Sequence, residues 1–431
     1  MVCRGSKKFI KKMFKIYSFC RKCLSTCLRL LSGKTRTNAL KRTFSLSNGP
    51  ERALAKYISS KIKMSGPISV AEYMKECLTN PQYGYYMNRD VFGQKGDFIT
   101  SPEISQMFGE LLGIWILDDW MKAGKPPCLN IVELGPGRGT LADDILRVLN
   151  KFSHVVEDVS LHLVEVSPKM RQLQRVKLSA PEMKKKELEN PVEKINSKYG
   201  IPVMWHNNVK GIPQGFSCFV AHEFFDALPI HSFQRTKHGW REVLVDVDEA
   251  AGSDKLRFVL SASNTPPTVY IQETETRDHV EICPEAGVIV QDIVQRITED
   301  GGSALIADYG HDGEKQDTLR AFKEHKLFDI LSEPGTVDLT ADVDFSYLRT
   351  MCGKSVSTYG PVMQSYFLKN MGIETRLKAL MMNASEKEQS DLVSGYRMLT
   401  DPKQMGERFK FFAIRQKSDI TDIPAGFTSL T

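Results

Sequence analysis

The sequence predicts an α/β fold in which a mainly parallel, Rossmann-like sheet is covered by helices on both faces. Apolar runs typical of strands alternate with segments of helical periodicity between residues 129 and 221 and again from 287 to 310. The first run, 129–134, leads directly into alternating glycines and the start of a helix. A Rossmann-like sheet opens its nucleotide site in this way. With 431 residues, 41% of them apolar, the chain can bury at least one large core.

Charge is distributed unevenly along the chain. The net charge is +6, but residues 1–48 hold 13 Lys or Arg and no Asp or Glu, so the remainder carries about −7. Apolar residues lie among the lysines of residues 7–17, as in a basic amphipathic helix. We therefore predict a mitochondrial presequence over 1–48, with cleavage before Ser45 in the Arg42-Thr43-Phe44-Ser45 segment, and a mature protein in the matrix. A nucleic-acid-binding arm is the alternative, but it lacks base-reading and aromatic partners nearby.

Cysteine spacing and hydropathy exclude two further classes. Four cysteines lie in the presequence without a second pair at metal spacing, and the other five are scattered singly. We expect reduced thiols and no metal site. No run reaches the roughly 18 apolar residues of a membrane span, so we expect no stable membrane insertion. Because base-reading and aromatic partners are missing near the basic leader, we also expect no nucleic-acid partner. Nothing in the sequence assigns an oligomeric state.

Residues 49–128 are predicted to form a helical N-terminal region with a loop that caps the cofactor and substrate. Helical spacing over 51–78 is broken at Gly66-Pro67 and ends in a turn rich in tyrosine. After a polar loop, Ser101 is suited to cap a helix whose first position is Pro102. The apolar face of that helix continues to residue 116 and precedes the first strand of the sheet.

Residues 129–431 are predicted to form the Rossmann-like domain. Its first half alternates strands with helices, at strand 129–134, helix 139–150, strand 160–165, helix 168–178, strand 202–205 and strand 216–221. A lysine-rich insert, 184–198, is predicted to continue the second of these helices as a solvated surface. The alternation predicts parallel strands joined by helical crossovers.

The second half interrupts this alternation and then resumes it. Two runs within about 231–282 alternate like the strands of a hairpin, which predicts an inserted antiparallel β element. The pattern beyond it predicts a helix at 287–299, a buried strand at 303–310, a helix around 361–381 and a strand near 409–414.

Gly135, Gly137 and Gly139 follow the first strand at G-x-G-x-G spacing. This differs from the G-x-G-x-x-G that wraps a dinucleotide pyrophosphate, so the expected ligand packs an uncharged part against bare backbone. S-adenosylmethionine (SAM) is such a ligand. Glu165 ends the next apolar run, where a carboxylate can accept hydrogen bonds from both ribose hydroxyls. We predict that these residues and Glu133 bind SAM; the alternative is that the glycines only form a tight turn.

Glu223 and Asp226 lie three residues apart directly after the apolar strand at 216–221. Ligands of open α/β sheets bind beyond the carboxyl ends of the strands, so the two carboxylates are expected in a partly dry pocket near the glycines. They could instead cap the next helix. If the methyl group of SAM passes to an arginine, bidentate carboxylates suit the planar, cationic guanidinium of that acceptor. We predict that Glu223, and after it Asp226, holds the guanidinium. His222 could take the released proton, or act as a structural hydrogen-bonding group.

The loop at 96–105 could fold over the methionine end of the cofactor. Thr100, Ser101 and the free N–H groups of the following helix suit a carboxylate, although an ordinary capped helix would explain the same residues. Tyr83, Tyr85 and Tyr86 could wall the acceptor channel or pack in the core.

Several long motifs make the chain resemble a known family. They are GDFITSPEIS (96–105), VELGPGRGTL (132–141), AHEFFDALP (221–229), DLTADVDFSYL (338–348) and MGERFKFF (405–412). Together they resemble the MidA-like class I methyltransferases, whose animal member is a mitochondrial complex I assembly factor. The resemblance spans about 65–414. It departs from the usual class I pattern at His206-Asn207-Asn208, where amides stand in place of the usual acid.

The resemblance implies a SAM-dependent protein arginine methyltransferase of the mitochondrial matrix. Its implied partner is an iron-sulfur core subunit of respiratory complex I. The resemblance implies that an arginine of this subunit is converted to symmetric dimethylarginine early in assembly. Gly135, Gly137, Gly139 and Glu165 fall on cofactor positions of the family, and Glu223 falls where an acceptor-contacting residue is common. Two alternatives stay open, namely a SAM-binding assembly chaperone without turnover and a methyltransferase acting on a small molecule.

Overall fold

A computed structural model describes residues 50–88, 100–153, 158–180, 194–250, 252, 254–417 and 422–427. Several predicted segments lie outside the described residues. They are the presequence at 1–48, residues 96–99 of the capping loop and residues 184–193 of the lysine-rich insert.

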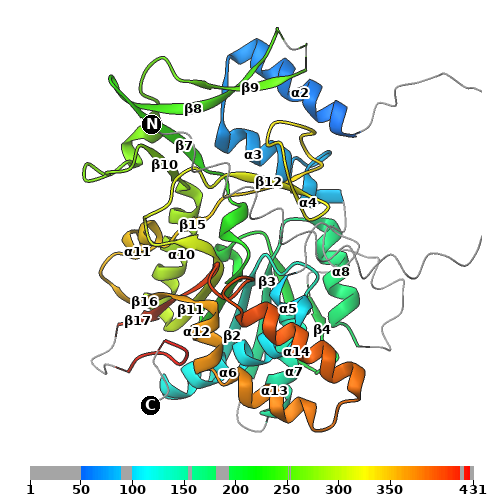
Figure 1. Cartoon of the computed structure of the whole chain (residues 1–431). Coiled ribbons are helices and arrows are strands. Elements are labelled where there is room, and N and C mark those ends of the chain that lie inside the picture. Colours follow the sequence, from blue (N-terminus) through cyan, green and yellow to red (C-terminus); the bar gives the residue numbers. More distant parts are fainter. Residues whose placement is uncertain are drawn as a thin grey trace, which may run out of the picture. The chain divides into compact units, whose positions relative to one another are not determined.

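The described residues form a nine-stranded central sheet in the order β16-β17-β11-β6-β2-β3-β5-β4, with β15 also paired to β11 (Figure 1). Five neighbouring strands run parallel: β11 (Gly302–His311), β6 (Ser217–His222), β2 (Cys128–Leu134), β3 (Asp158–Val164) and β5 (Pro202–His206). The remaining strands are β17 (Phe409–Gln416), β16 (Val356–Met363), β4 (Lys194–Asn196) and β15 (Val343–Asp344). The order reverses at β2, which lies between β3 and β6. Such a switch point is where open α/β sheets bind their ligands.

Side chains of β2 alternate between two hydrophobic cores, one on each face of the sheet. Leu129 and Ile131 join the core on one face, while Val132 and Leu134 join the core on the other. The first core is completed by α6 (Gln106–Lys122), α7 (Thr140–Lys151), α8 (Pro168–Leu178), α12 (Gln364–Asn370), α13 (Ile373–Met381) and α14 (Glu386–Thr400). The second is completed by α10 (Pro284–Asp300) and α11 (Phe345–Cys352). The predicted Rossmann-like fold with helices on both faces is confirmed.

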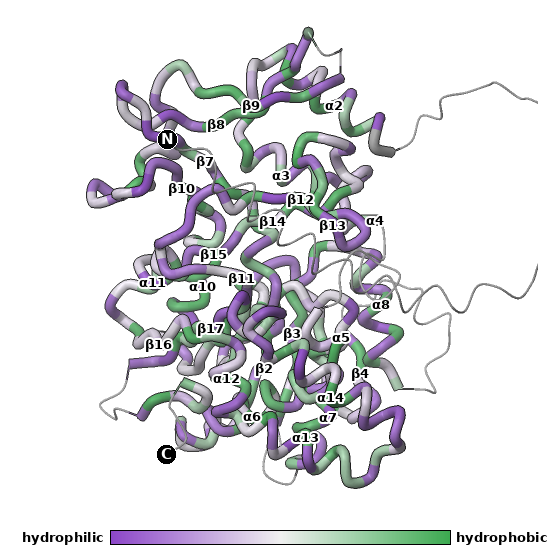
Figure 2. Tube along the Cα trace, viewed as in Figure 1, coloured by the Kyte–Doolittle hydropathy of each residue, from purple (hydrophilic) through white to green (hydrophobic). Residues whose placement is uncertain are grey.

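The predicted β insertion is present and forms a second, antiparallel sheet. Its strands are β1 (Ile68–Ser69), β7 (His231–Thr236), β8 (Gly239–Val247), β9 (Leu256–Leu260) and β10 (His279–Ile282). The helices α2 (Pro50–Ser65) and α3 (Val70–Thr79) share a core with β8 through Leu54, Tyr73 and Val245. Hydrophilic and hydrophobic residues are mixed along β8 and β9 (Figure 2). The N-terminal helices and the insertion are therefore packed together.

A small third sheet completes the part of the chain that the structure describes. It consists of β12 (Arg320–Lys323), β13 (Lys326–Phe328) and β14 (Asp338–Thr340). Two short helices, α4 (Tyr85–Asn88) and α5 (Ser101–Ile104), precede α6 in the chain. Both contribute residues to the candidate site.

Three of the predicted elements are wrong in detail. Ser101 is the first residue of α5 rather than its cap, and Thr100 occupies the cap position. The predicted helix is also split, because Ser105 is extended at φ −157° and its Oγ accepts the N–H of Met107 at 3.3 Å, which starts α6. In the lysine-rich insert, 194–196 form a strand, since Ile195 is buried and pairs with Val203 of β5.

The third element that was predicted wrongly is the helix around 361–381. Its first residues belong to β16, which pairs with β17 at the sheet edge, and the helical part is divided into α12 and α13. Gly372 takes the left-handed conformation at φ 85°, which ends the first helix and begins the second. The following helix, α14, was not predicted.

Candidate functional site

Four loops meet at the carboxyl edge of the parallel strands. They follow β2 at the glycines, β3 at Glu165, β6 at Glu223 and β11 at His311. The strands pair in register, with Leu134 opposite both Val164 and Ala221. Because parallel neighbours end at the same edge, residues distant in the sequence come together there.

The three glycines form a turn that no other residue adopts readily. Gly135, Gly137 and Gly139 have φ values of 62°, 50° and 81°, all left-handed. The N–H of Gly139 donates to the carbonyl of Pro136 at 2.7 Å, which closes the turn before α7. A Cβ on Gly135 would lie 2.8 Å from a ring carbon of Phe224, so bare backbone is required there. The close packing of Phe224 therefore requires glycine at position 135, and the left-handed backbone favours glycine at all three positions.

Glu165 is fixed by three donors. Its Oε1 accepts the N–H of Ser167 at 2.8 Å, its Oε2 accepts from the amide of Gln174 at 3.2 Å, and the backbone N–H of Val166 also donates to the carboxylate. A carboxylate has about four acceptor positions, so capacity for one ribose hydroxyl is left. Burial raises the pKa of Glu165, and these hydrogen bonds oppose the rise.

Gln174 was missed by sequence reasoning. Its amide also donates to the carbonyl of Gly137 at 2.7 Å, and its Oε1 accepts from the indole of Trp205 at 2.9 Å. One buried amide therefore ties the glycine turn to Glu165. A glutamine in the middle of an amphipathic helix carries no signal of this role in the sequence.

Glu133 lies within β2, just before the turn, and faces α7. It is 3% exposed, and burial raises its pKa to about 8, opposed only by a hydrogen bond from the backbone of Ala142. Its Oε2 has no hydrogen-bond partner in the described part of the chain. Glu133 is thus a largely protonated acid beneath the turn at neutral pH.

The loop after β6 brings Glu223 and Asp226 together. Glu223 adopts φ 49°, and its carboxylate accepts the backbone N–H of Ser101. Burial, followed by the charge of Asp226, raises the pKa of Glu223 well above its ordinary value. Burial also raises the pKa of Asp226 to about 6, although Thr340 donates to its Oδ2 at 2.8 Å. The two acids form a concentrated negative site when ionised.

His222 lies beside this loop with its Nε2 3.4 Å from Oε1 of Glu223. Its ring stacks on Phe409 at a centroid distance of 6.1 Å and meets the edge of Phe108 at 4.9 Å. Burial lowers the pKa of His222 to about 3, so the ring is neutral at physiological pH. The geometry brings it to the site, but its surroundings disfavour the protonated form.

The residues predicted to cap the cofactor lie at the same edge, beside Glu223. Ser101 is fully buried, and its backbone N–H is directed to Glu223 rather than to a separate carboxylate. Thr100 precedes it and makes no side-chain cap bond. Of the three tyrosines, Tyr85 is fully buried in the core, whereas Tyr86 donates to Asp338 at 2.6 Å. Tyr86 lies near the acidic loop, since the charges of Asp338 and Asp226 both raise its pKa in addition to burial.

At the end of β5, the side-chain oxygen of Asn207 is already engaged by an arginine. Arg171 of α8 donates to the side-chain oxygen of Asn207 at 2.8 Å and to the carbonyl of His206 at 2.9 Å. It also donates to the carbonyl of Glu165 at 2.7 Å. Arg171 therefore ties the ends of β3 and β5 together.

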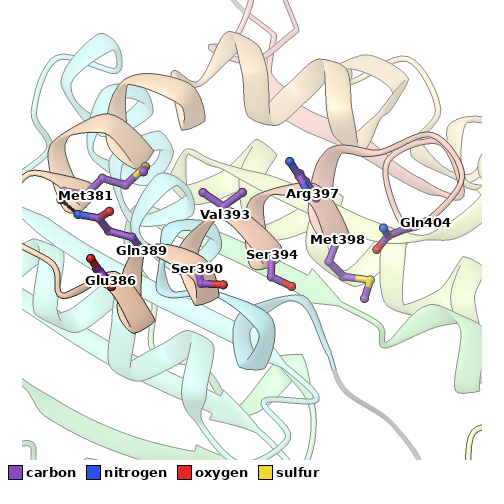
Figure 3. A pocket seen from close by; sticks show the side chains of 9 residues that line it. All are labelled: Met381, Glu386, Gln389, Ser390, Val393, Ser394, Arg397, Met398 and Gln404. Atoms are coloured by element: carbon purple, nitrogen blue, oxygen red, sulfur yellow. Dashed lines mark hydrogen bonds between the residues drawn. The ribbon is translucent and has the colours of Figure 1, made fainter. Parts of the chain in front are cut away.

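A surface cavity of about 630 Å³ lies elsewhere, along α14 (Figure 3). Glu386, Ser390, Val393 and Arg397 line it at helical spacing, with Met381 at one end. None of the predicted site residues lines it. Within the described ranges, no helix is long and apolar enough to span a membrane, and no group of three or more metal-ligating side chains is found.

The strand order and the left-handed glycine turn define the class I methyltransferase fold. A Burkholderia thailandensis protein crystallised with S-adenosyl-homocysteine has the same fold, with a TM-score of 0.69, 23% identity and coverage of 88% of this chain and 94% of that one. A second, native crystal structure of a Burkholderia thailandensis protein gives a TM-score of 0.68 at 24% identity, covering 88% of this chain and 93% of that one.

Sequence comparison identifies the family. The family model of S-adenosyl-L-methionine-dependent methyltransferases matches residues 111–362. The human protein arginine methyltransferase NDUFAF7, mitochondrial, is 52% identical over 404 residues, which cover 89% of this chain and 91% of that protein. The relative of the same name from Danio rerio is 50% identical and covers 94% and 99%. The chain therefore belongs to this family of mitochondrial SAM-dependent methyltransferases, as the motifs predicted.

Proposed function

We propose that this methyltransferase transfers methyl groups to arginine in a protein, and that the acceptor is an iron-sulfur core subunit of respiratory complex I. The loop with Glu223 and Asp226 carries the proposal, because paired buried carboxylates match a guanidinium in charge and shape. Relatives named protein arginine methyltransferases support the choice of arginine. The family resemblance supports the complex I subunit, symmetric dimethylation and the matrix.

The turn and Glu165 fit the cofactor. The left-handed glycine turn at the end of β2 supports close approach of the adenosyl group to main chain, and Glu165 retains an acceptor position for the ribose. We propose that Glu133 supports the turn from below, and that Thr100 and Ser101 close the site from the side of α5. When bound, SAM would supply an electrophilic sulfonium methyl group for transfer to the acceptor nitrogen, leaving S-adenosyl-homocysteine.

Glu223 has two tasks in this mechanism. Its ionised carboxylate holds the guanidinium so that one nitrogen faces the methyl group, and Asp226 adds negative charge nearby. The methylated nitrogen must lose one proton, because the product guanidinium keeps a single positive charge. Glu223 is better suited than His222 to take that proton, since burial favours the protonated acid and the neutral ring. We propose that His222 orients Glu223.

The domain organisation completes the proposal. We propose that residues 1–48 are a presequence, that 49–128 form a helical N-terminal region that closes the site, and that 129–431 form the methyltransferase domain with the insertion at about 231–282. The packing of α2 and α3 on β8 supports a joint role of the N-terminal region and the insertion beside the acceptor loop.

Mass spectrometry of complex I subunits tests this function. Subunits from cells that contain the protein should carry dimethylarginine on an iron-sulfur core subunit, and subunits from cells that lack it should not. Equal dimethylation in both samples would show that the acceptor lies elsewhere. Altered quinone precursors with unchanged subunits would favour a small-molecule acceptor.

A further inference from the structure

A single buried carboxylate organises the loop that carries Glu223. Asp308, in β11, is completely buried and lies beside the end of β6. Its Oδ2 accepts three successive backbone N–H groups, from Phe224 at 3.1 Å, Phe225 at 2.9 Å and Asp226 at 3.3 Å. Its Oδ1 accepts the N–H of Tyr309 at 2.9 Å. Both carboxylate oxygens are therefore engaged by main chain.

These bonds explain the unusual backbone at Glu223. Its N–H still follows the sheet and donates to the carbonyl of Ala307 at 3.0 Å, but its φ of 49° turns the chain out of the strand direction. Non-glycine residues rarely adopt this conformation, and it persists where the surroundings enforce it. Three N–H groups converging on Oδ2 of Asp308 form a concave nest that enforces it immediately after Glu223.

The other side of the loop is fixed as well. Phe224 packs on Gly135 so closely that a Cβ there would be 2.8 Å from the ring. The carbonyl of Asp226 accepts the N–H of Ala341 at 3.0 Å. The loop is thus held between the glycine turn, Ala341 just after β14, and Asp308. A shift of the loop away from Asp308 would displace Glu223 relative to the glycine turn.

Asp308 also belongs to the charge balance of the site. Burial raises its pKa well above the ordinary value, and the charges of Asp226 and Glu223 raise it further, while the amides of the loop oppose the rise. Other titratable or charged groups that face this cluster are Arg320, Asp338, Asp342, Glu103, Tyr86, Tyr309 and His222. Removing one of three mutually repelling acids would let the other two ionise at lower pH.

We propose that Asp308 is a positioning residue for methyl transfer, whose carboxylate gathers the amides of 224–226 and thereby aims Glu223 at the acceptor. It contacts neither cofactor nor acceptor in this role. The inference rests on the proposed function for its catalytic readout, but the positioning itself can be measured without turnover.

The test compares Asp308→Asn with wild type in three measurements. An amide has one acceptor oxygen, so its NH₂ group must face either the Tyr309 N–H or the three loop N–H groups. Hydrogen exchange at Phe224 and Phe225 should become at least about 100-fold faster. The kcat for methylating complex I isolated from cells lacking the protein should fall about 100-fold, with SAM affinity within about threefold of wild type. The acidic limb of the pH-rate profile should move to lower pH.

A double-mutant cycle and a surface control complete the design. Glu223→Gln combined with Asp308→Asn should lose no more activity than Glu223→Gln alone, because Asp308 acts through Glu223. Asp312→Asn removes an exposed partner of Arg349 near the same strand end and should behave as wild type. Asp308→Glu, which keeps a carboxylate, should retain more of the loop protection and of kcat than Asp308→Asn, and equal losses in both variants would contradict a role of the carboxylate.

The outcomes separate the two proposals. Unchanged exchange at the loop amides, or unchanged kcat and pH profile, would overturn the positioning role. Failure of both Asp308 variants to fold would also overturn it, by showing that the fold rather than the loop depends on this residue. Absence of methylation by wild type would instead overturn the proposed acceptor, while the exchange result would still decide the role of Asp308.

Discussion

At the scale of single residues, burial controls the charge of the site. Glu133, Glu223 and Asp226 are carboxylic acids whose pKa values burial raises, and His222 is a base whose pKa burial lowers. All four shifts favour neutral side chains in the free enzyme. A cationic acceptor would reverse the balance for the two acids of the loop, because an adjacent positive charge stabilises a carboxylate.

The pH dependence of methylation follows from these shifts. Glu223 and Asp226 must ionise to hold a guanidinium, and the pKa of Asp226 is raised to about 6 with that of Glu223 also raised. We predict that kcat/KM rises at least about tenfold between pH 5.5 and 8. A profile that is flat over this range would show that neither acid has to lose a proton.

Stability should show the opposite pH dependence through Glu133. Its folded pKa of about 8 exceeds the ordinary 4.5, so the folded state keeps a proton that the unfolded state releases. Stability is therefore lost as pH rises from about 4.5 to 8. We predict that Glu133→Gln gains several degrees in Tm relative to wild type on going from pH 5.5 to 8, measured without cofactor. A constant difference in Tm between the two proteins would exclude this linkage.

At the scale of elements, the glycine turn and the acidic loop are in direct contact. We predict that Gly135→Ala weakens SAM binding at least about tenfold, because its Cβ would push Phe224 and distort the turn. Gly200→Ala is the matched control, since Gly200 is also left-handed but has nothing within 4 Å of a new Cβ. Calorimetry on both variants measures the effect. Equal SAM affinities of the two variants would show that the contact between Gly135 and Phe224 does not influence SAM binding.

Local sequence patterns predicted the elements whose signals are themselves local. The helix predicted at 168–178 is confirmed at both ends. Its start depends on local signals, because Ser167 caps it and Pro168 begins it. Residues 361–363 were wrongly predicted to be helical because they end β16, whose strand conformation depends on pairing with β17, about 50 residues away in sequence. Patterning shows which residues are apolar but not which distant strand edge is left to pair.

The same distinction holds within the site. Sequence placed the glycines, Glu165, Glu223 and Asp226 at one edge, since strand ends are visible as the ends of apolar runs. The roles of Gln174 and Asp308 depend on bonds to residues 37 and 84 positions away. A buried amide or carboxylate acquires such a role only once the fold has brought its partners to it.

At the scale of the whole molecule, the methyltransferase core is joined to an N-terminal helical region and a β insertion. The core provides the cofactor turn, and the N-terminal region contributes Ser101 and Tyr86 beside the acids. This distribution is consistent with a large acceptor, since the acidic loop lies where these parts meet.

Cofactor preference is a property of the whole fold and can be measured by thermal unfolding. We predict that SAM raises the Tm by several degrees at concentrations well above its Kd, while NADH leaves it unchanged, because only SAM suits the G-x-G-x-G turn. Stabilisation by NADH of equal size would contradict the assignment of the turn.

Complementation of cells that lack the protein tests the central claim most directly, with dimethylarginine on the iron-sulfur core subunits of complex I measured by mass spectrometry. Wild type and Glu223→Gln should be compared at equal abundance, after calorimetry has shown that both bind SAM. We predict that wild type restores dimethylarginine and that Glu223→Gln does not. Full restoration by Glu223→Gln would contradict the account, because a carboxylate at this position would then be dispensable for methyl transfer.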